Sequence, residues 1–336
     1  MQPSSPPSPS RVLSDRWSAG PIPLDGPIEQ AVASPRGVAV RSFIAGCIGL
    51  LVGFIAFQLV VSPAATLILL AVKGVDFNAL GDAGAIARLL ETNVQELIIG
   101  NSVGQILGLG AVAFLLARLH TTAIGSYLRL RPPNWVLVGI ALVGLAALMP
   151  IVQWLGAVNQ SLPLPDWAQA MEQSQMELIE QVLGGGLGVP FNLLMLAVVP
   201  GICEELLFRG YVQRQFERGV GIAGGILLSG IIFGLYHLRL SQALPLSALG
   251  IYLAYLAWRT GSLWPAVIVH FANNAFAILV ADYATERPEL DAQALETMQV
   301  PWYILIPSVV AFAATMYVLH RLARLVRPLA AEDASP

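Results

Sequence analysis

Charged residues are scarce in this sequence. They make up 12% of its 336 residues, against about 25% in soluble domains, while hydrophobic residues make up 56%. The mean hydropathy is +0.69. A chain this apolar cannot fold as a soluble domain, so we expect it to reside in a lipid bilayer.

Cysteine and lysine are also nearly absent. The two cysteines, Cys47 and Cys203, each stand inside an apolar run, which excludes a disulfide scaffold and makes Cys203 a small core residue. Lys73 is the single lysine, so all other members of the 18 basic residues are arginines. Most of them stand at the ends of apolar runs, a pattern that sets membrane topology and does not indicate nucleic-acid binding.

The first 41 residues lack the apolar run that a cleavable signal peptide requires, and they are rich in proline and serine. We therefore expect residues 1–41 to form a disordered cytoplasmic tail. Residues 42–327 should form the membrane domain, and residues 328–336 a C-terminal tail.

Apolar runs long enough to cross a bilayer are abundant. A spanning helix needs about 20 mostly apolar residues, and eight such runs are bounded by charges or by Pro and Gly. They are 42–61 (with a continuation to 72), 97–116, 135–155, 191–211, 221–238, 243–258, 263–281 and 302–320. We predict an all-α polytopic membrane protein with about eight transmembrane helices.

The basic residues fall unevenly on the two sides that these spans define. One side holds four, namely Lys73, Arg88, Arg239 and Arg287, and the other side, with both termini, holds the remaining 14. The first side also carries two acidic segments, 166–180 and 282–296, and residues 166–181 have the pattern of an amphipathic surface helix. By the positive-inside rule, we expect an integral cytoplasmic-membrane protein with both termini in the cytoplasm.

Three expected spans contain polar side chains that cost several kcal/mol to place in a bilayer, so each is a candidate functional residue. The fourth span reads LAVVPGICEELLFRG, the fifth ends in IIFGLYHL, and the seventh reads SLWPAVIVHFANNAF. Their polar residues are Glu204, Glu205 and Arg209 in the fourth, His237 in the fifth, and His270, Asn273 and Asn274 in the seventh.

Helical geometry separates the two adjacent glutamates. Glu205 and Arg209 stand at i and i+4 with the acid first, the favourable order for an ion pair within one helix. Glu204 points about 100° away and has no partner in its own helix. We assign Glu205 and Arg209 a structural role and leave Glu204 free to act as a base.

Neighbouring residues extend this pattern. Pro200 has no N–H for the carbonyl of Leu196, so the fourth span is expected to bend near the glutamates. Phe233 precedes His237 by one turn and can cover one face of its ring. Asn274 follows His270 by one turn and offers amide donors where water is scarce, although an asparagine in a span also serves as interhelical glue.

The depths of these residues test whether they meet. With cytoplasmic turns near Arg218 and Gly261, Glu204 lies ~21 Å, His237 ~28 Å and His270 ~14 Å from those turns at about 1.5 Å per residue. Only tilted or kinked helices bring them to one site.

The motifs EELLFR, FGLYH and HFANN resemble the three motifs of the CPBP family, EExxxR, FxxxH and HxxxN, in the same order and each in an apolar helix. That family contains the type II CAAX prenyl endopeptidases and bacteriocin-processing or lysostaphin-resistance-like membrane proteins. The resemblance covers a core of about residues 190–280.

The resemblance implies an intramembrane glutamate-dependent endopeptidase. In it, Glu204 activates water with His237, His270 and Asn274 stabilise the oxyanion, and Glu205, Arg209 and Phe233 support the site. No cofactor is implied. The partners are a peptide or protein substrate at the membrane and the bilayer itself, with no nucleic acid.

Two other interpretations remain open. Glu204, His237 and His270 form the His₂Glu set of catalytic zinc sites, although the sequence contains no HExxH. The same pocket also suits a non-catalytic immunity or scaffold protein that binds a peptide. The residues do not identify the substrate, because a CAAX-like chain and a bacteriocin leader fit equally well, and they do not define the oligomeric state.

Overall fold

The computed structural model describes residues 35–77, 88–89, 92–167, 169, 186–285, 287 and 299–332. Every regular element in these residues is a helix, and seven helical stretches are long and apolar enough to cross a membrane. The chain is thus an all-α polytopic membrane protein. The tail before residue 35, most of the predicted amphipathic helix 166–181 and most of the acidic segment 282–296 lie outside the described residues.

The long helices are interrupted by short π-helical segments rather than by loops. The α-helices are α2 (Pro35–Phe54), α3 (Ser62–Lys73), α5 (Val94–Gly104), α6 (Val112–His120), α7 (Ile124–Tyr127), α8 (Trp135–Gln160), α10 (Val189–Leu193), α11 (Val199–Glu205), α12 (Gln213–Tyr236), α13 (Ala243–Thr260), α14 (Trp264–Thr285) and α16 (Trp302–Glu332). The π-helical segments are η1 (Ile55–Val61), η3 (Gln105–Ala111), η4 (Leu194–Val198) and η5 (Leu206–Val212), and η6 (Leu240–Gln242) is a 3-10 turn.

The fourth and fifth expected spans form one helical stretch of 48 residues, which explains why seven stretches stand where eight spans were expected. The chain reverses within it at Gly221, whose φ of 83° suits glycine. The rings of Phe208 and Phe233, which a straight helix would hold about 37 Å apart, lie 5.2 Å apart. The two passes therefore pack against each other.

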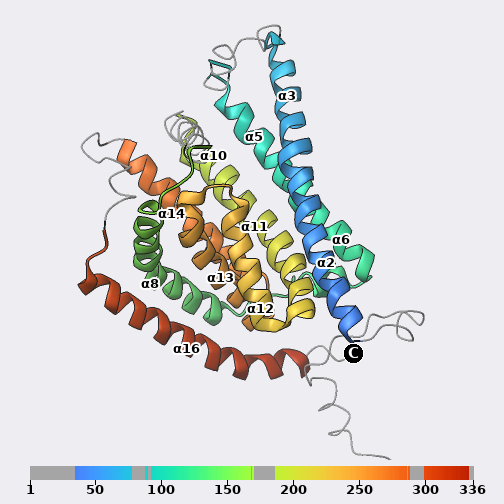
Figure 1. Ribbon diagram of the computed structural model, residues 1–336, viewed down its shortest axis with the longest axis vertical. Coiled ribbons are helices and arrows are strands. Elements are labelled where there is room, and N and C mark those ends of the chain that lie inside the picture. Colours follow the sequence, from blue (N-terminus) through green and yellow to red (C-terminus); the bar gives the residue numbers. More distant parts are fainter. Residues whose placement is uncertain are drawn as a thin grey trace, which may run out of the picture.

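The central layer carries the predicted motifs. Figure 1 shows α11, α12, α13 and α14 in the middle, with α2, α3, α5 and α6 along one side and α8 and α16 along the other. The first of these sides packs closely, because Gly100, Gly104 and Gly108 on α5 and η3 face α3 and η1. A Cβ at Gly108 would come within 2.5 Å of the Phe57 backbone, so small residues at this spacing set the distance between the two helices.

Two predicted boundaries differ from the structure. Helix α2 begins at Pro35, before the expected span start at residue 42, and α16 continues to Glu332, beyond the expected span end at residue 320. The extension of α16 is rich in Arg, Leu and Ala, which favour helices. A span predicted from hydropathy alone covers the membrane-embedded part of a helix and not the whole helix.

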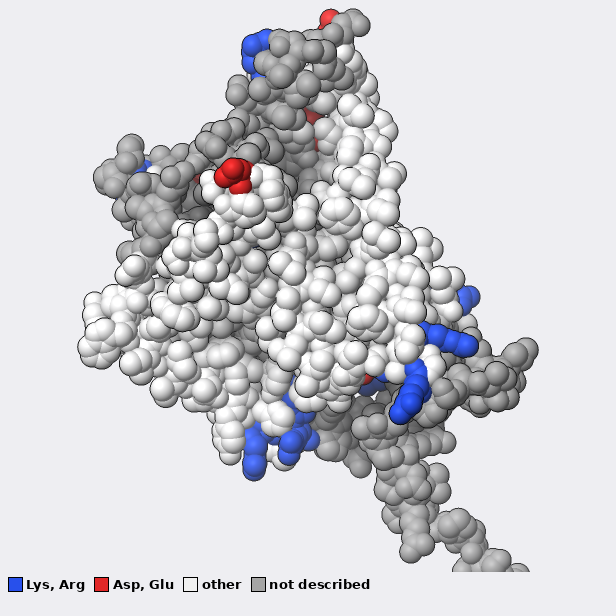
Figure 2. Space-filling model, viewed as in Figure 1, with Lys and Arg blue, Asp and Glu red and all other residues white. Residues whose placement is uncertain are grey.

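The surface is polar at its ends and apolar between them. Figure 2 shows the visible Lys and Arg side chains gathered mainly at the lower end of the molecule, below a broad white belt. The start of α2 and the end of α16 lie at that same end (Figure 1). One correction applies to the count of basic residues: Arg209, which the count assigned to a loop, is completely buried.

Candidate active site

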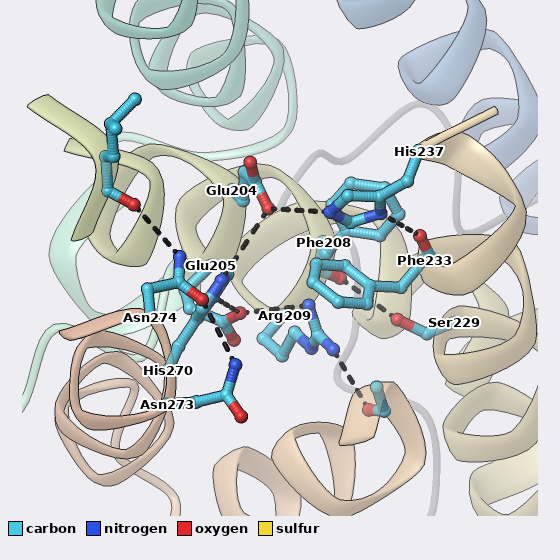
Figure 3. A network of polar contacts seen from close by, with 12 residues as sticks. Glu204, Glu205, Phe208, Arg209, Ser229, Phe233, His237, His270, Asn273 and Asn274 are labelled. Carbon is cyan, nitrogen blue, oxygen red and sulfur yellow. Dashed lines mark hydrogen bonds and ion pairs between the residues drawn. The ribbon is translucent and has the colours of Figure 1, made fainter. Parts of the chain in front are cut away.

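Three helices bring the predicted residues together. Glu204 and Glu205 end α11, His237 follows α12, and His270 and Asn274 lie on α14. Figure 3 shows their side chains converging from these helices. The three motifs, separate in sequence, thus form one cluster.

Glu205 is held in this cluster through one of its carboxylate oxygens, while the other, Oε2, is buried without a hydrogen-bond partner among the described residues. One of its oxygens, Oε1, lies 3.0 Å from Arg209 Nη1 and 2.9 Å from His270 Nδ1. Arg209 Nη2 donates to the carbonyl of Gly250 at 2.9 Å, and its guanidinium lies 4.3 Å from the centre of the Phe233 ring. The side chains of Glu205 and Arg209 are 0% exposed, so their charges compensate each other away from water.

Glu204 is not engaged in this way. Its Oε2 lies 3.9 Å from both His237 Nε2 and His270 Nε2, too far for a hydrogen bond. That oxygen is buried and has no hydrogen-bond partner among the described residues. The His237 side chain is 33% exposed, whereas those of Glu204 and His270 are 12% and 3% exposed.

The partners of the two histidines assign their tautomers. His237 Nδ1 lies 2.8 Å from the carbonyl oxygen of Phe233, and His270 Nδ1 lies 2.9 Å from the Glu205 carboxylate. Both partners can only accept, since Glu205 is paired with Arg209, so each Nδ1 carries a hydrogen. In the neutral rings both Nε2 atoms are therefore acceptors that face Glu204, and only a protonated ring donates from Nε2.

Phe233 holds both imidazoles in place. Its ring lies edge to face with His237 at 4.8 Å and with His270 at 5.6 Å between centroids. The Phe233 ring also contacts the ring of Phe208 and the guanidinium of Arg209. The expected cover over one face of His237 is present and extends to His270.

Asn274 joins α14 to the helix that carries the glutamates. Its Nδ2 donates to the carbonyl of Leu196 at 3.2 Å, the carbonyl that Pro200 cannot reach with an N–H. Next to Pro200, Gly201 lets α14 approach closely, since a Cβ there would lie 3.3 Å from the backbone nitrogen of Phe271. The expected irregularity near Pro200 is the π-helical segment η4, and Asn274 supplies a hydrogen bond at this point.

The unequal depths estimated from the sequence came from misplaced turns. The chain reverses at Gly221, so Glu204 and His237 lie 17 and 16 residues from the turn and reach nearly equal depth. The turn before α14 is not at the surface, because Ser262 and Leu263 are 4% and 1% exposed and the N–H of Leu263 donates to the carbonyl of Arg129. His270 therefore lies deeper than its short distance from that turn indicated.

The alternative zinc site has suitable ligand atoms, but the distances between them are long for a zinc ion. Two Nε2 lone pairs and a carboxylate oxygen converge, and each Nδ1 donates to an acceptor, as in histidines that bind metals. The 3.9 Å between Glu204 Oε2 and each Nε2 is longer than the roughly 3.3 Å between ligands of a tetrahedral zinc ion. Within the described part of the chain, no group of three such residues is placed to hold a metal ion.

Several contacts of the site were not predicted. The carbonyls of Gly250 and Leu196 are backbone partners, and of these only Leu196 had a signal in the sequence, the missing N–H of Pro200. His120 and His320 contact the hydroxyls of Tyr211 and Tyr255 at 3.0 and 2.8 Å. These two histidines join helices and lie outside the cluster of the three motifs.

Comparison with known proteins agrees with the resemblance seen in the motifs. Residues 186–276, which contain all three motifs, match the family described as "Type II CAAX prenyl endopeptidase Rce1-like". This Rce1-like segment is thus similar to that family.

The Rce1-like segment also matches a curated protein of Bacillus subtilis (strain 168), "Putative membrane peptidase YdiL". The two are 28% identical over 92 residues, which cover 27% of this chain and 38% of the relative. The match thus spans well under half of that relative's length. No solved structure matches the chain.

Proposed function

We propose that this protein is an intramembrane endopeptidase in which Glu204 is the general base. The observation that carries the proposal is the contrast between the two glutamates. Glu205 is bound to Arg209 and His270 through Oε1, whereas Glu204 faces two imidazole nitrogens at 3.9 Å with an Oε2 that has no hydrogen-bond partner among the described residues. The Rce1-like segment supports peptide hydrolysis as the reaction.

The spacing around Glu204 leaves room for one water molecule between the carboxylate and the rings. Hydrogen bonds of about 2.8 Å from a single water bridge acceptors that are 3.9 Å apart. Such a water donates one hydrogen to Glu204 and the other to Nε2 of neutral His237, which leaves its lone pair directed at a substrate carbonyl.

In hydrolysis, Glu204 takes a proton from this water as its oxygen bonds to the carbonyl carbon. The carbonyl electrons move to oxygen and form a tetrahedral oxyanion. When the intermediate collapses, the carbon–nitrogen bond breaks and the proton held by Glu204 passes to the leaving nitrogen. His237 keeps the water oriented in the first step.

His270 and Asn274 stabilise the oxyanion in this proposal. His270 donates from Nε2 only as an imidazolium, while its Nδ1 donates to the Glu205 carboxylate. Asn274 has two amide hydrogens, one of which is donated to the backbone carbonyl of Leu196. The second has no partner in the described residues and can serve the oxyanion.

The substrate class is a peptide or protein chain at the membrane, CAAX-like or bacteriocin-leader-like, which enters beside the partly exposed His237. Both chain ends face the cytoplasm. The bias of arginines and the common position of the α2 start and α16 end support this orientation (Figure 1). A C-terminal reporter that cytosolic reagents cannot reach contradicts it.

The function is tested by comparing the termini of membrane peptides in cells that carry the wild-type protein or Glu204→Gln. Termini present only with the wild type identify cleavage sites and support the proposal. Purified protein in proteoliposomes then receives these peptides with and without a prenyl group, which separates the two substrate types. Identical termini in both strains, with both proteins present in the membrane, favour the non-catalytic binding protein.

A zinc peptidase is the second candidate, because both Nδ1 atoms donate to acceptors in the manner of metal-bound histidines. Glu204, His237 and His270 would be the ligands. Since their spacing exceeds that of tetrahedral ligands, glutamate catalysis without metal remains the first candidate.

A further inference from the structure

Two arginines near the end of the helical pass that carries Glu204 form no ion pair with a carboxylate among the described residues. Arg214 and Arg218 lie on α12 shortly before the reversal at Gly221, and both are half-buried. Their guanidinium groups lie 5.4 and 5.3 Å from the centre of the Tyr127 ring. Neither forms an ion pair with any residue that the structure describes.

The groups around them do not neutralise this charge. The nearest carboxylate in sequence, Glu217, lies 2.5 Å from Arg129 Nη2 and accepts from Gln213 Nε2 at 2.8 Å. Burial raises the pKa of Tyr127, so its hydroxyl stays uncharged. Partly buried charges in proteins are normally paired, and these two leave a surplus of positive charge.

Apolar side chains are exposed next to this pair. At the reversal, Val220 and Ile222 are 47% and 43% exposed, and Leu119 on α6 is 79% exposed. Leu119 adjoins His120, whose ring is stacked on Tyr127 at 5.9 Å between centroids. The cationic pair thus lies between apolar surfaces, as a headgroup site at a membrane boundary requires.

We propose that Arg214 and Arg218 bind the phosphate of an anionic lipid headgroup, with the acyl chains against the apolar surface at Val220, Ile222 and Leu119. Guanidinium groups match phosphate oxygens in geometry as well as charge. Free inorganic phosphate offers the same chemistry but gains nothing from the exposed apolar residues. A lipid here braces the turn between the pass that carries Glu204 and the pass that leads to His237.

Binding is measured on the delipidated full-length protein in a neutral detergent, where no charged bilayer surface is present. Phosphatidylglycerol and phosphatidylcholine are titrated separately, and retained lipid is counted by native mass spectrometry. The test variant is Arg214→Gln/Arg218→Gln. The control is Arg321→Gln/Arg324→Gln, which removes the same charge from two exposed arginines on α16, outside the proposed site.

We expect phosphatidylglycerol to bind at least about tenfold more tightly than phosphatidylcholine, and the test variant to lose this preference while the control keeps it. Equal losses in both variants mean general charge attraction and overturn the site. In a third arm, inorganic phosphate is added to the protein with phosphatidylcholine. If it raises the melting temperature as much as phosphatidylglycerol does, the lipid assignment is wrong.

Discussion

Two adjacent carboxylates in this protein lie in opposite surroundings. The Glu205 region is closed. The Glu205 carboxylate contacts the Arg209 guanidinium and the His270 imidazole, Arg209 donates to the Gly250 carbonyl, and the side chains of Glu205 and Arg209 are fully buried. The Glu204 region is less enclosed, because its Oε2 has no hydrogen-bond partner among the described residues and the neighbouring His237 side chain is one-third exposed (Figure 3). A closed polar network stabilises a fold, whereas an unpartnered carboxylate beside a partly open space is available for chemistry.

The largest effect is expected at the open carboxylate. Glu204→Gln keeps the size of the side chain and removes its basicity, so turnover should fall by about 10²–10⁴ with little change in melting temperature. Cleavage of an identified peptide and thermal unfolding of the same sample measure both quantities. An unfolded Glu204→Gln protein, with a folded but inactive Glu205→Gln protein, reverses the roles that we assign.

The closed carboxylate should respond in stability first. Glu205→Gln leaves Arg209 without its counter-ion at a site with 0% exposure, where breaking a buried pair costs about 3–5 kcal/mol. Expression and melting temperature should fall, and some activity should survive in the folded fraction. Adding Arg209→Gln should recover part of the stability, because no unpaired charge then remains.

The ion pair of Lys73 and Glu96 is a matched control for this change. Its atoms are 2.8 Å apart, but the Lys73 side chain is 47% exposed. Glu96→Gln should therefore cost no more than about 1 kcal/mol. Equal losses for Glu96→Gln and Glu205→Gln would contradict the closed character of the Glu205 region.

A smaller effect is expected at the contact that connects the two regions. Asn274→Ala removes the donor to Leu196 and should cost about 1–3 kcal/mol of unfolding free energy. In a Pro200→Ala background the cost should be smaller, because the new N–H of residue 200 can reach the same carbonyl.

This coupling is measured by a double-mutant cycle on thermal or denaturant stability. Asn159→Ala is the control, since the Asn159 amide donates to the backbone carbonyl of Leu240, away from Pro200. If the losses of stability for Asn274→Ala and Pro200→Ala are additive, the Asn274 amide does not replace the hydrogen bond that Pro200 cannot donate to the Leu196 carbonyl. Turnover of Asn274→Ala in the Pro200→Ala background then reports the oxyanion role separately.

Much of the site could be predicted because its rules are local. The pairing of Glu205 with Arg209 follows from an i, i+4 spacing, and Glu204 on another face of the helix was left without a partner. The contact of Phe233 with His237 follows in the same way. Hydropathy likewise located the helices, since each expected span coincides with a helical stretch of the structure except for one or two residues at its ends.

The remaining features depend on contacts between distant segments. The bond from His270 to Glu205, and the carbonyl of Gly250 that receives Arg209, follow from how α13 and α14 pack, which no spacing encodes. The depth of His270 was misjudged because its turn is buried beneath the segment around Arg129. Hydropathy treats every turn as a surface turn, so it could not detect this.

The smallest expected effect is that of a metal chelator, for which we predict no loss of turnover. In the proposed reaction Glu204 activates the water, and the 3.9 Å distances from Glu204 to the two Nε2 atoms suit a bridging water better than a tetrahedral zinc ion. Purified protein should keep its rate of peptide cleavage in excess phenanthroline, and a non-chelating isomer of the same compound controls for effects on the detergent or lipid. Loss of activity with the chelator alone, restored by stoichiometric zinc, would assign Glu204, His237 and His270 as ligands. In that case the open character of the Glu204 region would reflect a metal site, and the general base would have to be sought elsewhere.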